Sequence, residues 1–168
     1  MENQLPVFSI KFSLDDCIDT QRIRAYGLKY KLDIYEALGK LKAEFLKFEY
    51  PDCQMLDGDV DLGDDVDRPA AMVKCLSPLS YFQYIRYVFK FQNFGNTCLF
   101  SIYKLYERKG KWRSEAKMTY YMTITNPAQE EYLHNLEKMI ESLISFGVKL
   151  LKDADPNKIE KEEEPIME

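Results

Sequence analysis

Three consecutive segments decide the fold expected for this chain: YFQYIRYVFKFQ at residues 81–92, TCLFSIYKLYER at 97–108 and WRSEAKMTYYMTI at 112–124. In each of them apolar or aromatic residues alternate with polar ones, which is the period of a strand with one buried face. Gly95 and Gly110 lie between the segments and suit tight turns. We therefore predict an antiparallel meander of three strands.

Two further strands and a helix are predicted upstream of the meander. Residues 7–14 and 26–32 both alternate between apolar and polar side chains, so we expect two strands that pair with each other. From residue 34 to 48 the apolar residues recur every three or four positions, and Asp33 with Glu36 matches a capping box. This pattern predicts a helix over 34–48.

A second helix and a tail are predicted downstream of the meander. Asn126 is a favourable N-cap, and Pro127 is favourable at the first helical position. The amphipathic pattern that follows predicts a helix to about residue 152, and the charged residues after it predict a disordered acidic tail over 153–168. Together with a short strand at 71–76, the prediction is an α+β fold, with an antiparallel sheet in ββα then βββα order packed against two helices.

The composition suits one domain. Of 168 residues, 46% are hydrophobic and 30% are charged, so we expect a single α+β domain over residues 1–152 that contains an acidic loop at 50–68. No run of about 20 apolar residues could span a bilayer, so no membrane partner is expected. The N-terminus lacks the pattern of a signal peptide, and the four cysteines form no CxxC pair. These features predict a cytoplasmic protein with reduced thiols.

Charge is distributed unevenly along the chain. Residues 69–125 carry nine basic and two acidic side chains, a net charge of +7, whereas residues 50–68 carry one basic and seven acidic side chains, a net charge of −6. The tail is also acidic and resembles in charge, but not in an aromatic tip, the tails of single-stranded DNA-binding proteins. A basic block between two acidic segments favours an anionic partner for the block.

The meander supplies the main functional hypothesis. If Ile85, Tyr87, Leu99, Tyr103 and Leu105 face the core, the opposite face of the meander is basic and aromatic. Cations on such a face neutralise phosphates and its rings stack on bases, so we predict a non-enzymatic protein that binds single-stranded nucleic acid there, in competition with its acidic tail. The predicted binding residues are Arg86, Lys90, Lys104, Arg113 and Lys117 for phosphates, with Tyr84, Phe100, Tyr106 and Tyr121 for stacking.

A protein-interaction role is the alternative hypothesis. Val88, Phe100 and Ile102 would then form the apolar centre of an interface ringed by charge. An inhibitor, an immunity or chaperone-like protein, or a structural component of a larger assembly would fit this description. A homodimer through the same sheet face is compatible with either hypothesis.

No enzymatic, metal or cofactor motif is specific. The aspartates of 57–68 alternate as in a calcium loop, but Leu62 and Arg68 stand where an EF-hand needs Gly and Glu. Glu115 and Lys117 resemble the metal-binding strand of restriction-endonuclease-like nucleases, yet a cross-strand ion pair explains Glu115. His134 has no nucleophile at a suitable spacing. We therefore predict no catalytic residue, no bound metal and no cofactor.

Overall fold

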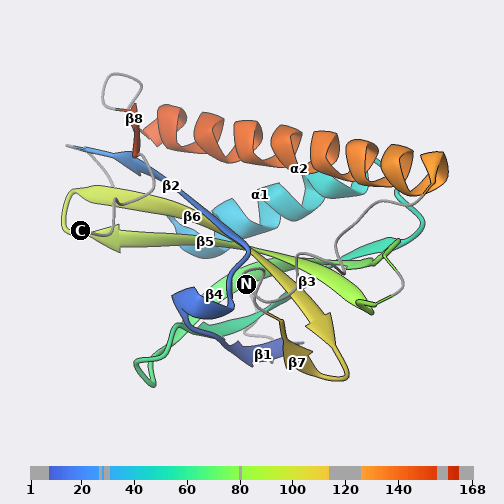
Figure 1. Ribbon diagram of the computed structural model, residues 1–168. Helices are drawn as coiled ribbons and strands as arrows, with labels where there is room; N and C mark the ends of the chain where they lie inside the picture. Colours follow the sequence, from blue (N-terminus) through green and yellow to red (C-terminus); the bar gives the residue numbers. More distant parts are fainter. Residues whose placement is uncertain are drawn as a thin grey trace.

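The computed structural model describes residues 8–26, 28, 31–79, 81–113, 126–154 and 159–162. Two helices pack on one face of a curled, mixed sheet, so the predicted α+β class is confirmed (Figure 1). No helix among the described residues is long and apolar enough to cross a membrane. The elements are β1 (Phe8–Lys11), the 3-10 helix η1 (Leu14–Asp16), β2 (Asp19–Ala25), α1 (Ile34–Leu46), β3 (Cys53–Asp61), β4 (Asp67–Leu76), β5 (Tyr84–Phe94), β6 (Thr97–Arg108), β7 (Lys111–Trp112), α2 (Pro127–Ala154) and β8 (Ile159–Glu162).

The sheet has the strand order β1-β3-β4-β5-β6-β2-β8, and β7 pairs with β6 beside this path. β1 and β3 are parallel, and the other described pairs are antiparallel. β2 has the same length as the predicted strand at 26–32 but lies earlier in the chain, and it pairs with β6 instead of β1. Residues 27, 29 and 30 of the predicted strand lie outside the described residues. The segment that contains η1 connects β1, at one edge of the sheet, to β2, near the opposite edge.

The pattern of β2 explains why its position was predicted wrongly. Ile23 and Ala25 are buried against the helices, while Arg22 and Arg24 occupy the alternate positions. A strand that carries arginines on its second face is polar overall, and the alternating tyrosines and leucines that follow it give a stronger apolar pattern. Burial of only two small or medium side chains was too weak a signal to outweigh that pattern.

The predicted acidic loop at 50–68 is wrong for most of its length, because β3 and β4 form a hairpin there. Gly58 and Val60 are buried, while Asp57 and Asp59 alternate with them along β3. Asp57 accepts a hydrogen bond from Lys42 of α1 at 3.0 Å, which gives one of these carboxylates a structural partner. Asp57 and Asp59 are therefore strand residues, and within 50–68 only residues 50–52 and 62–66 lie outside β3 and β4.

The register of the β5–β6 hairpin differs by one residue from the predicted one. The two-residue turn at 95–96 places Phe94 opposite Thr97, so even-numbered residues of β5 share a face with odd-numbered residues of β6. Phe91 and Phe100 are consequently cross-strand partners on the helix face, with stacked rings 4.4 Å apart. Leu99, Tyr103 and Leu105, which were predicted to face the core with Ile85 and Tyr87, lie on the opposite face.

The helices confirm the sequence prediction closely. Asp33 caps α1 by accepting a hydrogen bond from the Glu36 amide at 3.1 Å, and Asn126 accepts one from the Gln129 amide at 2.9 Å at the start of α2. Gly147 of α2 allows a close approach to the sheet, because a Cβ at that position would lie 2.3 Å from the Phe100 ring. α2 therefore packs closely against the helix-facing side of β6.

The C-terminal segment is only partly as predicted. The disordered acidic tail over 153–168 is not confirmed, because β8 pairs with β2 at the edge of the sheet (Figure 1). Of the predicted third meander strand at 112–124, the structure describes the short strand β7, and residues 114–125 lie outside the described residues. The predictions for Glu115, Lys117 and Tyr121 fall in that part of the chain.

Candidate functional site

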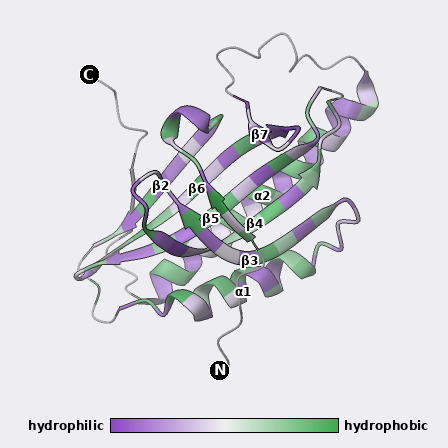
Figure 2. Ribbon diagram, turned by 90° about the horizontal axis from the view of Figure 1, so that it is seen from below, coloured by the Kyte–Doolittle hydropathy of each residue, from purple (hydrophilic) through white to green (hydrophobic). Residues whose placement is uncertain are grey.

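The predicted binding residues are divided between the two faces of the sheet. We call the face turned away from α1 and α2 the far face, and Figure 2 shows how hydrophilic and hydrophobic residues alternate along the strands that form it. The far face contains Tyr84, Arg86 and Lys90, together with Thr20, Arg22, Arg24, Arg68, Ala70, Met72, Val88, Gln92, Leu99, Ser101, Tyr103, Leu105, Glu107 and Trp112. Phe100, Lys104 and Tyr106 lie on the helix face, and Arg113 directly follows β7.

The three predicted binding residues on the helix face, Phe100, Lys104 and Tyr106, contact other residues of the protein. Phe100 and Tyr106 are buried in the core beneath α2. The Lys104 ammonium lies 4.0 Å from a Glu137 carboxylate oxygen of α2, and 5.7 Å and 5.5 Å from the ring centres of Tyr87 and Tyr106. The expectation that these residues share a solvated face with Lys90 is wrong, because the hairpin register turns them toward the helices.

One end of the far face is neutralised. The Arg86 Nε donates to the Glu107 carboxylate at 2.6 Å, and its guanidinium carbon lies 5.7 Å from the Trp112 ring centre. Lys74 lies 4.1 Å from the ring centre of Tyr84. These cations are therefore paired with an acid or an aromatic ring inside the protein, which leaves less charge to attract a ligand.

The middle of the far face is a second, smaller core. Phe12, just after β1, packs edge-on against Tyr103 of β6 with ring centres 5.1 Å apart. The Trp112 indole donates to the Lys11 carbonyl at 2.8 Å, so β7 is tied to the end of β1. Burial of Val60, Met72, Val88 and Leu105 in the same cluster shows that the sheet curls over its own far face. These side chains are buried in a second core, so this part of the far face is not available to a ligand.

The other end of the far face is cationic. Arg22, Ser101 and Lys90 form one row across β2, β6 and β5, since Ser101 is the register partner of both cations. Arg24 occupies the next row, opposite Leu99, and Arg68 of β4 lies close enough to Lys90 to affect its charge. We call Arg22, Arg24, Arg68 and Lys90 the cationic cluster.

Lys90 is the buried member of the cationic cluster. Only 2% of its surface is exposed, and its ammonium donates to the Gln92 side-chain oxygen at 2.9 Å. Within the described residues no carboxylate pairs with it. Burial, reinforced by the positive charges of Arg68 and Arg22, lowers the pKa of Lys90 to about 8. A buried ammonium without a counter-charge is costly, and a bound anion would offset that cost.

The two arginines nearest to Lys90 are satisfied to different degrees. Arg68 forms a short ion pair with Asp64, at 2.6 Å between Nη2 and Oδ2. The Nη1 of Arg22 is buried and has no hydrogen-bond partner in the described part of the chain. Arg22 therefore offers an unused donor beside the buried Lys90, which is the arrangement that an anion would complete.

Exposed aromatic residues lie at the same end of the far face. Tyr26 follows the last residue of β2 and is 38% exposed, and Phe94 closes β5 and is 48% exposed. The guanidinium of Arg24 lies 5.9 Å from the Tyr26 ring centre. Sequence reasoning missed Arg22, Arg24, Arg68 and both rings. The alternation of arginines with Ile23 and Ala25 was the signal that could have found Arg22 and Arg24.

The acidic strand β8 borders the cationic cluster. In the antiparallel register of β2 and β8, Arg22 is opposite Glu162 and Arg24 is opposite Glu160. The C-terminal segment thus brings negative residues to the edge of the sheet at which the two arginines lie.

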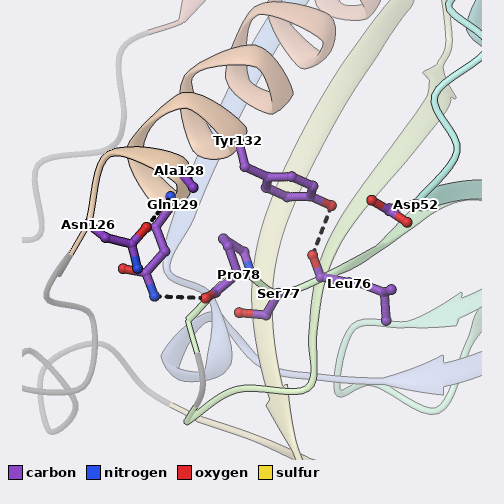
Figure 3. A pocket seen from close by; sticks show the side chains of 8 residues that line it. All are labelled: Asp52, Leu76, Ser77, Pro78, Asn126, Ala128, Gln129 and Tyr132. Carbon is purple, nitrogen blue, oxygen red and sulfur yellow. Dashed lines mark hydrogen bonds between the residues drawn. The ribbon is translucent and has the colours of Figure 1, made fainter.

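A shallow hollow of about 420 Å³ lies at the N-terminus of α2 (Figure 3). The Tyr132 hydroxyl donates to the Leu76 carbonyl at 2.9 Å, and the side-chain amide of Gln129 donates to the Pro78 carbonyl at 3.0 Å. These hydrogen bonds hold α2 against the segment after β4. Because the Tyr132 and Gln129 side chains already bond to backbone carbonyls, the hollow is a weaker ligand site than the cationic cluster.

Comparison with known proteins yields little. No protein-family model matches the chain, and no curated protein matches it. Among solved structures, the di-domain ARO/CYC StfQ from the steffimycin biosynthetic pathway aligns with a TM-score of 0.36 and 12% sequence identity. The alignment covers 84% of this chain and 52% of that protein, so this chain spans about half its length. A likeness at this level carries no argument about function.

Proposed function

We propose that the protein is a non-enzymatic binding protein whose ligand is single-stranded nucleic acid, held by the cationic cluster at one end of the far face. The observation that carries the proposal is Lys90, which is almost fully buried beside Arg22 without an acidic partner among the described residues. A phosphate would supply the missing negative charge and accept a hydrogen bond from the buried Nη1 of Arg22.

The aromatic residues next to the cluster favour a nucleic acid over a small anion. Tyr26 and Phe94 expose their rings within one or two rows of the arginines. Bases of a single strand stack on such rings while its phosphates follow neighbouring cations. This site differs from the predicted one in nearly all its residues, and Lys90 is the member that the two sets share.

β8 fits the role of an internal competitor. Its register brings Glu160 and Glu162 opposite Arg24 and Arg22, where a phosphate backbone would otherwise bind. Displacement of this edge strand would expose the arginines, so the acidic C-terminal segment would reduce affinity for nucleic acid in a salt-dependent way.

The proposal is tested by fluorescence anisotropy of a labelled single strand of about 20 nucleotides, at two salt concentrations. We expect binding by the intact chain, weaker binding by Arg22→Gln and Lys90→Gln, and unchanged binding by Lys104→Gln, whose lysine lies on the helix face. Absence of binding at low salt, or equal losses in all three variants, would show the proposal to be wrong.

The role of β8 has its own test in the same assay. A chain that ends at residue 155 lacks β8, and the double variant Glu160→Gln, Glu162→Gln keeps the strand but removes its two negative charges. We expect both to bind more tightly than the intact chain, with a difference that shrinks as salt is added. Unchanged affinity in both would contradict the competitor role of β8 without contradicting the proposed binding site.

A protein-interaction role remains the second candidate, and the outer side of α1 favours it. Tyr35 is 70% exposed and Leu46 is 63% exposed, and their spacing places them on the same side of the helix. Two exposed large side chains on one stripe suit an apolar contact with a partner protein. Binding through them would respond little to salt and would be lost in Leu46→Glu, whereas Arg22→Gln would leave it unchanged.

A further inference from the structure

Two thiols face each other in the β3–β4 hairpin, outside the proposed binding site. Cys53 and Cys75 are register partners, and their sulfur atoms are 2.9 Å apart. The Leu76 amide donates to the Asp52 carbonyl at 3.2 Å, which makes Cys53 and Cys75 a non-hydrogen-bonded pair. Such pairs bring the Cα atoms of antiparallel strands closest together, at about 4.5 Å, which lies within the range that a disulfide can bridge.

The two thiols differ in accessibility. Cys75 is fully buried, whereas Cys53 is half-buried and lines an open hollow of about 350 Å³ between the ends of β3 and β4. Lys74 and Tyr84 line the same hollow. Because Cys53 is partly exposed and Cys75 is not, a small reagent from solvent would meet Cys53 first.

The two thiols also differ in acidity. The hydrogen bond between the sulfurs lowers the pKa of Cys53 and raises that of Cys75, so Cys53 ionises first. Burial raises the pKa of both Cys17 and Cys98 to about 11, which keeps those thiols protonated. The thiolate is the reactive form of cysteine, so reactivity is concentrated at the accessible member of the pair.

We propose that Cys53 and Cys75 are an oxidation site that a hydroperoxide converts into an intramolecular disulfide. The Cys53 thiolate attacks the peroxide oxygen, the O–O bond breaks, and Cys53 becomes a sulfenic acid while water or an alcohol leaves. Cys75 then loses its proton and attacks the Cys53 sulfur, the S–O bond breaks, and the hydroxide leaves as water with that proton. Two thiols are oxidised to one disulfide and one hydroperoxide is reduced.

The expected effect of the disulfide is local. It would join the ends of β3 and β4 next to Tyr132, whose hydroxyl already bonds to the Leu76 carbonyl. A covalent cross-link between these strands restricts the unfolded chain, so the oxidised protein should have a higher midpoint of thermal unfolding than the reduced protein. The site is independent of the cationic cluster, and nucleic-acid binding is not required for it.

The experiment treats the intact, reduced protein with hydrogen peroxide and then alkylates the remaining thiols. We expect a loss of two alkylatable thiols and of two hydrogen atoms, about 2 Da, with recovery of both on reduction with dithiothreitol. Peptide mapping of the peroxide-treated protein with its natural sequence should assign the new bond to Cys53 and Cys75, so the result does not depend on any variant folding correctly.

Matched variants separate this pair from the other thiols. Cys53→Ser and Cys75→Ser should each abolish disulfide formation, whereas Cys17→Ser and Cys98→Ser should leave it unchanged. The proposal is overturned if four thiols remain alkylatable under conditions that oxidise glutathione, if the bond joins other cysteines, or if Cys53 proceeds to sulfinic acid without a disulfide.

Discussion

Lys90 and Lys104 lie on the two central strands of the same sheet, and the difference between their surroundings separates the two faces. Lys104 faces α2, where Glu137 and two tyrosine rings surround its charge. Lys90 faces away from the helices and is buried with Gln92 as its hydrogen-bond acceptor and two arginines nearby. The charge of Lys104 has an acidic partner within the protein. The charge of Lys90 has none, so it lowers the stability of the folded protein and would be offset by a bound anion.

The strongest test of the two faces concerns two phenylalanines of the same hairpin. Phe100 is buried on the helix face, so Phe100→Ala should lower the free energy of unfolding by about 3–5 kcal/mol. Phe94 is half-exposed at the hairpin end, and Phe94→Ala should lower it by about 0.5 kcal/mol or less. Urea unfolding measures both. Equal effects would mean that the two rings are not on differently buried faces.

The next effect concerns the charge of Lys90. Because its folded pKa of about 8 lies below the ordinary value of 10.5, the folded state releases the proton first, and stability of the natural chain should rise between about pH 8 and 10.5. At pH 7, Lys90→Met should be more stable than the natural chain by roughly 1–3 kcal/mol.

This gap between Lys90→Met and the natural chain should narrow as pH rises through that window, which unfolding curves at several pH values would record. Lys104→Met is the matched control. It removes the Glu137 ion pair and should lower stability by about 1 kcal/mol or less. A gap that stays constant with pH would contradict the assigned burial of the Lys90 charge.

A smaller effect is expected on the salt dependence of nucleic-acid binding. Loss of one phosphate contact in Arg22→Gln should reduce the slope of log K against log salt by about one. Lys104→Gln should leave the slope unchanged, because its side chain lies under α2. Anisotropy titrations over a salt series provide the slopes. A lower slope in Lys104→Gln would place a phosphate contact on the helix face and contradict the proposed site.

The smallest effect is expected from the exposed rings. Tyr26→Ala and Phe94→Ala should each weaken single-strand binding by about 1 kcal/mol, roughly fivefold, through the loss of one stacked base. Tyr35→Ala removes a more exposed ring from α1 and should not change the affinity. Titration of the three variants at one salt concentration is sufficient, and a loss in Tyr35→Ala as large as the others would argue against stacking at the cationic end.

Local features of the sequence predicted the elements that depend on neighbouring residues. The caps at Asp33 and Asn126 and the spacing of apolar residues placed both helices, because capping and helical periodicity act over one or two turns. Gly95 marked the β5–β6 turn for the same reason. The basic character of the meander was also correctly identified, but its division between two faces was not.

The cationic cluster depends on features that no short stretch of sequence contains. The partner of β2 is β6, which lies about 80 positions further along the chain, and this pairing brings Arg22 into the row of Lys90. A one-residue difference in hairpin register exchanges every side chain between faces, so Phe100, Lys104 and Tyr106 were assigned to the wrong side. The β3–β4 pairing of Cys53 with Cys75 is a third such case.

By itself, the sequence determined the α+β class, the two capped helices, the central hairpin and the excess of positive charge in the meander, because propensity, capping and periodicity are local properties. The tertiary structure decided which lysine is buried without an acid, which arginines lie beside it, and which thiols touch. Strand pairing and the curl of the sheet bring these groups together over long chain separations, and the free energy that selects that arrangement comes from the packing of both cores.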